Sequence, residues 1–177
     1  MKFTEFGKSI MDWRKHHWFF TPESLDSFVG RVQAGALYHP IHGRDLMLGK
    51  LMLAVTEVSE MDEADDHANY REEMADTAIR ILDITAALNI DIDGNLKMVE
   101  SEVIKQMDIM GVVNQLSAAA ECVRKDNVPG LAMALARAFR LLLLFSAGDG
   151  FDLMAEMEKK MSVNWKRPIK HGKLCSL

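Results

Sequence analysis

The chain is poor in cysteine and in basic charge, and each shortage argues against a class of protein. Its two cysteines, Cys122 and Cys175, lie far apart and match no metal-ligand spacing, which argues against a disulfide framework and a zinc site. This cysteine usage fits a reduced, cytoplasmic protein. The 177 residues carry a formal net charge of −5, whereas nucleic-acid binding needs a basic surface. We therefore expect no nucleic-acid partner.

The sequence also lacks the apolar pattern of a signal peptide or a membrane span. The first residues, MKFTEFGKSIMDWRKHH, contain no apolar core of the kind a signal peptide needs. The longest apolar stretch, LAMALARAFRLLLLFSAG, is interrupted by Arg137 and Arg140, so it reads as a buried helix. We expect no membrane span.

Proline is scarce as well, and no alternating run bounded by turn residues suggests a sheet. Almost every long segment instead has helical periodicity, with only four prolines in the chain. The sequence predicts an all-α helical bundle. A single domain over residues 1–177 is expected, because a chain of this length with 49% hydrophobic residues can bury one core.

Start and stop signals place the predicted helices along the chain. A long helix is expected over about residues 43–66. Asn69 is predicted to cap the next helix, with Glu72 reaching back as in a capping box, and that helix should end near Leu88. Asn127 is predicted to begin the very apolar helix.

Two segments of the chain align without a gap at an offset of 61 residues, so that residues 51–94 lie over residues 112–155. The identity is low, and a chance alignment is the alternative. The sequence predicts two fused helix-hairpin repeats, an acid-bearing one at about 42–108 and a degenerate one at about 109–165, followed by a basic tail at 164–177. The acids of the first repeat are replaced in the second: Glu57, Glu73 and Asp76 align with Ala118, Ala134 and Arg137.

The first repeat contains two carboxylate pairs at helical spacing. Glu57 and Glu60 are three residues apart, as are Glu73 and Asp76, so each pair lies on one helix face. A short connection makes the two helices antiparallel neighbours, which can bring the pairs together. Four clustered carboxylates require protonation or a hard divalent cation, and oxygen-only ligands favour magnesium or manganese over zinc. The alternative, a solvated acidic face, fits poorly because the neighbouring residues are apolar.

The same residues carry a resemblance to a known family. EVSE, twelve residues and then EMAD resemble the ExxE…ExxD signature of the MazG-like all-α nucleoside triphosphate pyrophosphohydrolases. EEMADTAIRILD is similar to one branch common in bacteria and their phages, and EKKMSVNWKRPIKHGKL resembles the tail of that branch. Here about sixty residues separate the NIDI turn from the tail, where that branch has few. One chain with an acid-bearing half and a degenerate half resembles the dimeric dUTPases of this superfamily.

The resemblance implies hydrolysis of a (deoxy)nucleoside triphosphate to the monophosphate and pyrophosphate, in control of the nucleotide pool. Mg²⁺, with Mn²⁺ as a substitute, would be held by Glu57, Glu60, Glu73 and Asp76. Glu60 is our choice for the base that takes the proton from the attacking water, although spacing does not separate it from Glu57. Asp83 lies on the face of Asp76 and is a candidate outer-shell group.

Substrate binding requires cations for the phosphates and a surface for the base. Asn164, Arg167, Lys170 and Lys173 offer donors to phosphate, although an ordinary basic terminus is the alternative. Among the aromatic residues of WRKHHWFFTP, Trp18 is the candidate for stacking on the base, although such residues more often pack a helix onto a core.

Three classes of function stay open at this stage. The first is the metal-dependent hydrolase, a pseudo-dimer within one chain that can also form a homodimer. The second is a catalytically inactive helical protein that binds nucleotide and regulates a partner. The third is a ferritin-like di-metal redox bundle. Such bundles use Glu-x-x-His pairs, whereas both pairs here end in Glu or Asp, which argues against this class.

Overall fold

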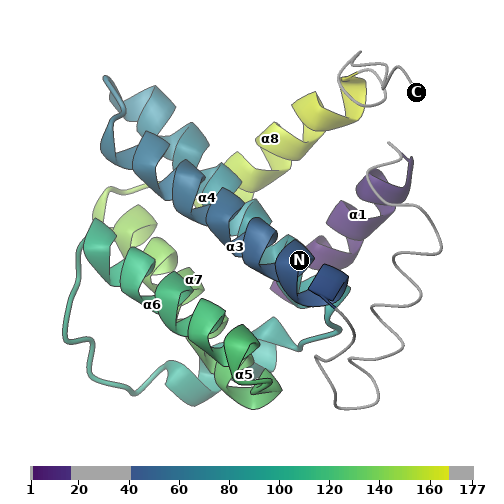
Figure 1. Cartoon of the computed structure of the whole chain (residues 1–177). Coiled ribbons are helices and arrows are strands. Elements are labelled where there is room, and N and C mark those ends of the chain that lie inside the picture. Colours follow the sequence, from purple (N-terminus) through teal and green to yellow (C-terminus); the bar gives the residue numbers. More distant parts are fainter. Residues whose placement is uncertain (1, 17–40, 168–177) are drawn as a thin grey trace.

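The computed structural model describes residues 2–16 and 41–167, and every regular element in these ranges is an α-helix (Figure 1). No strand occurs in them, so the predicted all-α fold is confirmed. The helices, labelled as in Figure 1, are α1 Phe3–His16, α3 Ile41–Asp62, α4 His67–Ala87, α5 Ile92–Val99, α6 Ile109–Arg124, α7 Val128–Gly148 and α8 Leu153–Lys166.

The helix ends follow local capping chemistry, and one predicted cap is wrong. The N-cap of α4 is Asp66, whose carboxylate accepts a hydrogen bond from the backbone N–H of Asn69 at 2.8 Å. Asn69 is therefore the residue being capped, and α3 ends at Asp62 rather than at 66. The predicted end of α4 near Leu88 is confirmed by its C-cap, and Asn127 is the N-cap of α7 as predicted.

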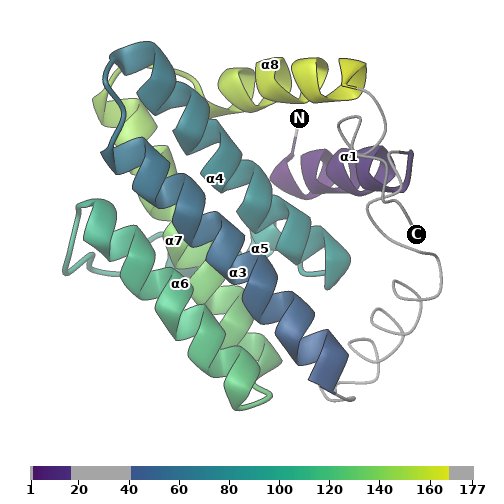
Figure 2. The same ribbon diagram turned by 45° about the horizontal axis from the view of Figure 1, so that its top comes forward.

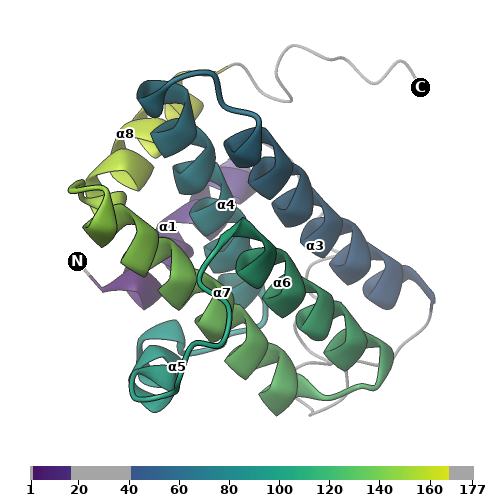
Figure 3. The same ribbon diagram turned by 90° about the vertical axis from the view of Figure 1, so that its left-hand side faces the viewer.

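Two antiparallel hairpins form the centre of the fold. Helices α3 and α4 make the first and α6 and α7 the second; α3 packs on α6 and α4 on α7 (Figures 1 and 3). Helices α1 and α8 both pack on α4 and extend from the same side of it, as Figure 2 shows. Gly7 allows α1 to approach closely, because a Cβ there would lie 3.2 Å from the carbonyl oxygen of Leu82.

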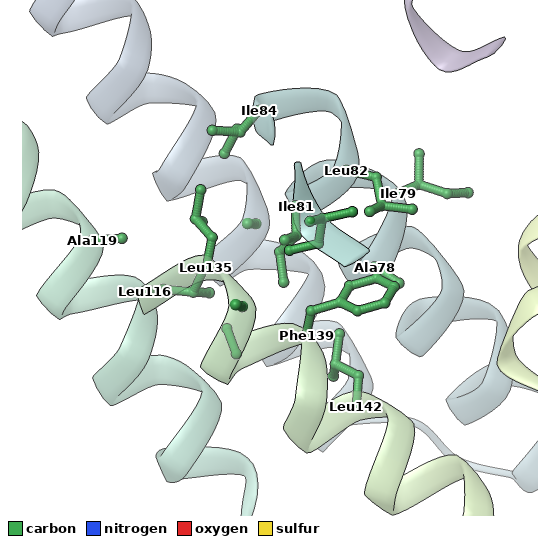
Figure 4. Packing of buried hydrophobic residues seen from close by; sticks show 14 of the residues in the cluster. Ala78, Ile79, Ile81, Leu82, Ile84, Leu116, Ala119, Leu135, Phe139 and Leu142 are labelled. Atoms are coloured by element: carbon green, nitrogen blue, oxygen red, sulfur yellow. The ribbon is translucent and has the colours of Figure 1, made fainter. Parts of the chain in front are cut away.

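The core lies between the hairpins and is mostly aliphatic, and Figure 4 shows the part of it around Phe139. Phe139 of α7 is fully buried and meets the ring of Phe3 edge to face, with centroids 4.9 Å apart. Ile81 of α4, Leu116 of α6 and Leu135 of α7 are also buried. Each such side chain stabilises the fold by about 1.5–3 kcal/mol through removal from water.

The second helices of the two hairpins have matching lengths and ends, whereas the first helices differ, with 22 residues in α3 and 16 in α6. Helices α4 and α7 each contain 21 residues. Asp66 and Asn127 cap their starts, and each chain turn after the helix contains a left-handed residue, Asn89 at φ 53° and Gly150 at φ 73°. Asp66 and Asn127 are 61 residues apart, as are Asn89 and Gly150, and 61 residues is the offset of the sequence alignment.

Helix α7 is long and apolar enough to cross a membrane by length and composition alone. Half of its most apolar window is buried inside the protein. The residues that line this window include Phe139 and Leu135, which are part of the core described above. The helix therefore serves the interior of this bundle.

Candidate metal centre

Three carboxylates of the first hairpin converge where α3 and α4 face each other. Glu57, Glu60 and Glu73 each place one carboxylate oxygen within 4.8 Å of the others. Glu57 is buried, Glu73 is half-buried and Glu60 is exposed. The structure thus brings together three of the four predicted metal ligands, with one side of the group open to solvent.

The packing of α3 on α4 explains this convergence. Val58 and Met61 of α3, and Met74 and Ala75 of α4, are all buried between the helices. Since residues on one helix face recur every three to four positions, burying these neighbours turns the adjacent glutamates toward the seam between α3 and α4. A four-residue connection, 63–66, keeps the two helices antiparallel.

The convergence of acids changes the titration of Glu73. Burial raises its pKa to about 7, and the negative charges of Asp76, Glu60 and Glu57 act in the same direction, while Lys160 opposes them. A glutamate at the surface titrates near 4.5. This cluster therefore holds more negative charge than the nearby cations offset, which is the condition that a divalent cation relieves.

Glu57 has a cationic partner from the facing helix. Arg80 of α4 donates from Nε at 3.0 Å and from Nη2 at 2.8 Å to the same oxygen of Glu57. This ion pair joins α3 to α4, because Glu57 and Arg80 lie on different helices. It leaves the second carboxylate oxygen of Glu57 for another ligand.

Asp76, the fourth predicted ligand, lies next to a lysine of α8. The Nζ atom of Lys160 is 2.6 Å from Asp76 Oδ2 and 2.6 Å from Glu72 Oε1. Burial alone would lower the pKa of Lys160, but its hydrogen bonds to Asp76 and Glu72 outweigh burial and raise it. Glu72 is consequently not part of a capping box. Lys160 is a site residue that the sequence did not single out.

Asp83, the predicted outer-shell group, is buried within a set of cations. It accepts a hydrogen bond from Lys50 Nζ at 2.6 Å and pairs with the guanidinium of Arg14 from α1. Burial lowers the pKa of Lys50 to about 8, against the attraction of Asp83. Asp83 thereby ties α1, α3 and α4 together beside the acidic cluster.

A cavity of about 170 Å³ opens next to Asp76, between α1, α4 and α8. Two buried acceptors line it: among the described residues, Asn164 Oδ1 and Asp83 Oδ1 have no hydrogen-bond partner. Buried acceptors are rarely left unpaired in folded proteins, which is consistent with a ligand that donates to them. The basic residues of the lining are Arg14, Arg80, Lys160 and Arg167.

The predicted substrate-binding residues fall into two groups. Asn164 and Arg167 both line this cavity. Asn164 is 8% exposed, so it belongs to the packed base of α8 and not to a loose basic terminus. Trp18, Lys170 and Lys173 lie outside the described residues. A neighbouring aromatic residue that the structure does describe, Trp13, lines the cavity.

Comparison with known proteins gives no relative for this chain: no protein-family model, curated protein or solved structure matches it. The functional argument therefore depends on the site itself and on the motifs.

Proposed function

We propose that this protein is a metal-dependent hydrolase that cleaves a (deoxy)nucleoside triphosphate to the monophosphate and pyrophosphate, as its resemblance to the MazG-like family implies. The observation that carries the proposal is the placement of an acidic cluster directly beside a basic cavity. Phosphoryl-group chemistry needs both, a cation held by carboxylates and donors for phosphate oxygens.

The donor set of the acidic cluster fits magnesium. Glu57, Glu60 and Glu73 offer only carboxylate oxygens, which Mg²⁺ and Mn²⁺ prefer, and neither histidine nor thiol contributes to the group. When bound, the metal would neutralise charge on the phosphates and orient the attacking water. The raised pKa of Glu73 supports this fit, because a cation would remove the repulsion that contributes to the shift.

The contacts of the two α3 glutamates support different roles for them. Glu57 is buried and already accepts two hydrogen bonds from Arg80, which fix its direction. Glu60 is exposed, so water reaches it. We assign metal binding to both residues, and to Glu60 the further role of accepting the proton of the attacking water.

Lys160 and Asp76 give the proposal a specific second element. Asp76 binds Lys160 in the absence of substrate, so it would join the metal ligands by releasing this lysine. The released ammonium group would then be beside the basic cavity, where it can hold phosphate oxygens together with Arg14 and Arg167. In this assignment Lys160 neutralises Asp76 until the phosphate group of the substrate binds.

The fused-repeat organisation is part of the same proposal. The matching lengths and caps of α4 and α7 support a duplicated hairpin of MazG-like type, in which only the first copy holds the acids. The first copy contributes α3 and α4 to the site, while α8, at the end of the second copy, contributes Lys160 and Asn164. Each chain would then hold one composite site.

The test is to incubate the full chain with Mg²⁺ and a panel of canonical and modified NTPs and dNTPs, and to separate the products by chromatography. Monophosphate and pyrophosphate are expected from at least one substrate. Glu73→Gln should abolish both, whereas Glu63→Gln, an exposed acid outside the cluster, should leave turnover unchanged. Absence of turnover with both Mg²⁺ and Mn²⁺ would refute the hydrolase assignment.

One observation favours the second candidate, an inactive protein that binds nucleotide and regulates a partner. Arg80 and Lys160 already pair with Glu57 and Asp76, so half of the motif acids have counter-charges without any metal. Isothermal titration separates the two candidates. A hydrolase should bind nucleotide more tightly with Mg²⁺, whereas a metal-free binder should show equal affinity in EDTA.

A further inference from the structure

A second cavity, of about 460 Å³, lies away from the acidic cluster, between the segment after α5, the start of α6 and the middle of α7. These three helices share one face of the molecule in Figure 3. The volume is within the range of about 300–1,000 Å³ that is typical of small-molecule sites. None of the residues assigned above to the hydrolytic site lines this second cavity.

Residues 102–106, which follow α5, form one wall of the cavity, here called its roof. Side chains of α7 and α6 hold this segment in place. Arg140 donates from Nη1 to the carbonyl oxygens of Val99 and Glu102, at 2.7 and 2.9 Å. Gln106 accepts a hydrogen bond from Asn114 at 2.8 Å. The cavity is therefore built by specific contacts from both helices.

The lining has excess positive charge. Arg137 and Glu102 form a two-point ion pair, at 2.6 and 2.7 Å, and compensate each other. Arg140 donates to backbone carbonyls and also attracts the carboxylate of Glu102, with which Arg137 is already paired, while Lys105 is exposed at the rim. One acid therefore faces three cations in this lining. An anion entering here would find two cations, with Leu141 as an apolar wall.

The second cavity corresponds to the first through the offset of 61 residues. Four residues of the first cavity have counterparts that all line the second: Asp76, Ile79, Arg80 and Asn164 correspond to Arg137, Arg140, Leu141 and Val103. Asp76, the acid that lines the first cavity beside Lys160, thus corresponds to Arg137 in the second. Helix α1 narrows the first cavity with Ile10 and Trp13, and no residue of α1 lines the second, which accounts for its larger volume.

We propose that this cavity is a second nucleotide site, which binds a nucleoside phosphate directly and without a metal ion. Arg137 stands where the first cavity has Asp76 and pairs with Glu102, the one acid of this lining, so the phosphate meets Arg140 and Lys105 where the first site would use a cation. The amides of Asn114 and Gln115, together with Leu141, suit a base. The choice of a nucleoside phosphate as the ligand rests on the proposed function. The positive charge and the volume of the cavity are independent of that function.

Isothermal titration of the full chain in EDTA tests this site, with nucleoside mono- and triphosphates and inorganic pyrophosphate as probes. Lys105→Glu and Arg140→Gln change the lining, and Lys97→Glu, on the exposed face of α5 outside the cavity, is the matched charge control. Thermal unfolding of each variant accompanies the titration, because Arg140 also holds the roof. Lys105→Glu alters only the rim, so it remains informative if Arg140→Gln unfolds.

At least one nucleotide should bind in EDTA, more tightly than pyrophosphate, and both cavity variants should weaken it about tenfold while Lys97→Glu changes it less than about twofold. No nucleotide binding in EDTA, or equal weakening by Lys97→Glu, would overturn the site. Equal affinity for pyrophosphate would overturn the nucleoside assignment. Binding that depends on Lys105 would support the second site even if no triphosphate is hydrolysed. Hydrolysis without such binding would overturn the second site and leave the proposed function intact.

Discussion

The α3–α4 and α6–α7 hairpins have similar backbones and different interiors. Helices α4 and α7 are equal in length and are capped in the same way, by Asp66 and Asn127. Helix α4 nevertheless carries Glu73 and Asp76 beside its seam with α3, whereas α7 has Ala134 and Arg137 at the equivalent positions. The comparison separates two requirements: capping residues and apolar spacing determine a hairpin, and a few additional side chains determine what it can bind.

The largest expected difference between the hairpins is in activity. Glu60→Gln should lower triphosphate hydrolysis at least about 100-fold, because even outer-shell partners of metal ligands contribute 10–100-fold. Glu121, the equivalent residue of the second hairpin, is an exposed partner of Arg124 and Lys125. Glu121→Gln should therefore leave the rate unchanged. Steady-state assays of both variants check this, and equal losses would remove the functional distinction between the hairpins.

Stability should differ at Leu82 and Leu143, which are equivalent leucines with unequal burial. Leu82 is 0% exposed, whereas Leu143 is half-buried. Leu82→Ala should lower the free energy of unfolding by about 2–5 kcal/mol through the cavity it leaves. Leu143→Ala should cost clearly less, since solvent already reaches it. Urea denaturation of the two variants measures the difference, and the reverse order would show that the two environments are misassigned.

The helix caps should make the hairpins alike. Asp66 accepts from the N–H of Asn69 at 2.8 Å and Asn127 from that of Gly130 at 3.0 Å, so both caps satisfy an equivalent donor. Asp66→Ala and Asn127→Ala should each cost about 1 kcal/mol. Thermal unfolding of the two variants tests this, with Asp66→Asn as a control that keeps a capping side chain. A loss at only one position would contradict the equivalence.

The smallest effect concerns pH and is confined to the first hairpin. Because burial raises the pKa of Glu73 to about 7, its contribution to the stability of the metal-free protein is complete below about 4.5 and is lost as pH rises through 7. Magnesium requires the deprotonated form, so the increase in Tm caused by Mg²⁺ should grow between pH 6 and pH 8. Thermal shift assays at both pH values measure this growth.

Glu73→Ala, which introduces the residue found at position 134, is the control for this pH prediction. It should remove the Mg²⁺-dependent increase in Tm at both pH values. An increase that is the same at pH 6 and pH 8 in the unaltered protein would contradict the role of Glu73 as a titrating ligand.

The parts of the fold that depend on local sequence could be predicted. Helical periodicity predicted the all-α class, and capping chemistry placed Asn127 at the start of α7. The spacing of Glu57, Glu60 and Glu73 predicted a shared seam, where the structure brings their oxygens within 4.8 Å. Asn69 was predicted as a cap because Glu72, three residues later, completes the pattern of a capping box; the cap is Asp66, and Glu72 binds Lys160 of α8.

The cations that pair with the acids of the site could not be predicted, because each comes from a distant part of the chain. Arg14 and Lys50 reach Asp83 across 69 and 33 residues, and Arg80 reaches Glu57 across 23. Such pairs depend on how α1 and α3 pack on α4, which periodicity does not encode. The second cavity has the same origin, since its roof segment and α7 are far apart in sequence.

The bridge from Lys160 to Glu72 and Asp76 also sets an order of events during synthesis. Glu72 and Lys160 are 88 residues apart, so at 5–20 residues per second the lysine emerges from the ribosome roughly 4–18 s after the acids. During this interval the first hairpin is complete without the lysine of α8. A nascent chain would therefore hold its acids before it gains the group that holds phosphate, and assembly of the site would be the last step of its folding.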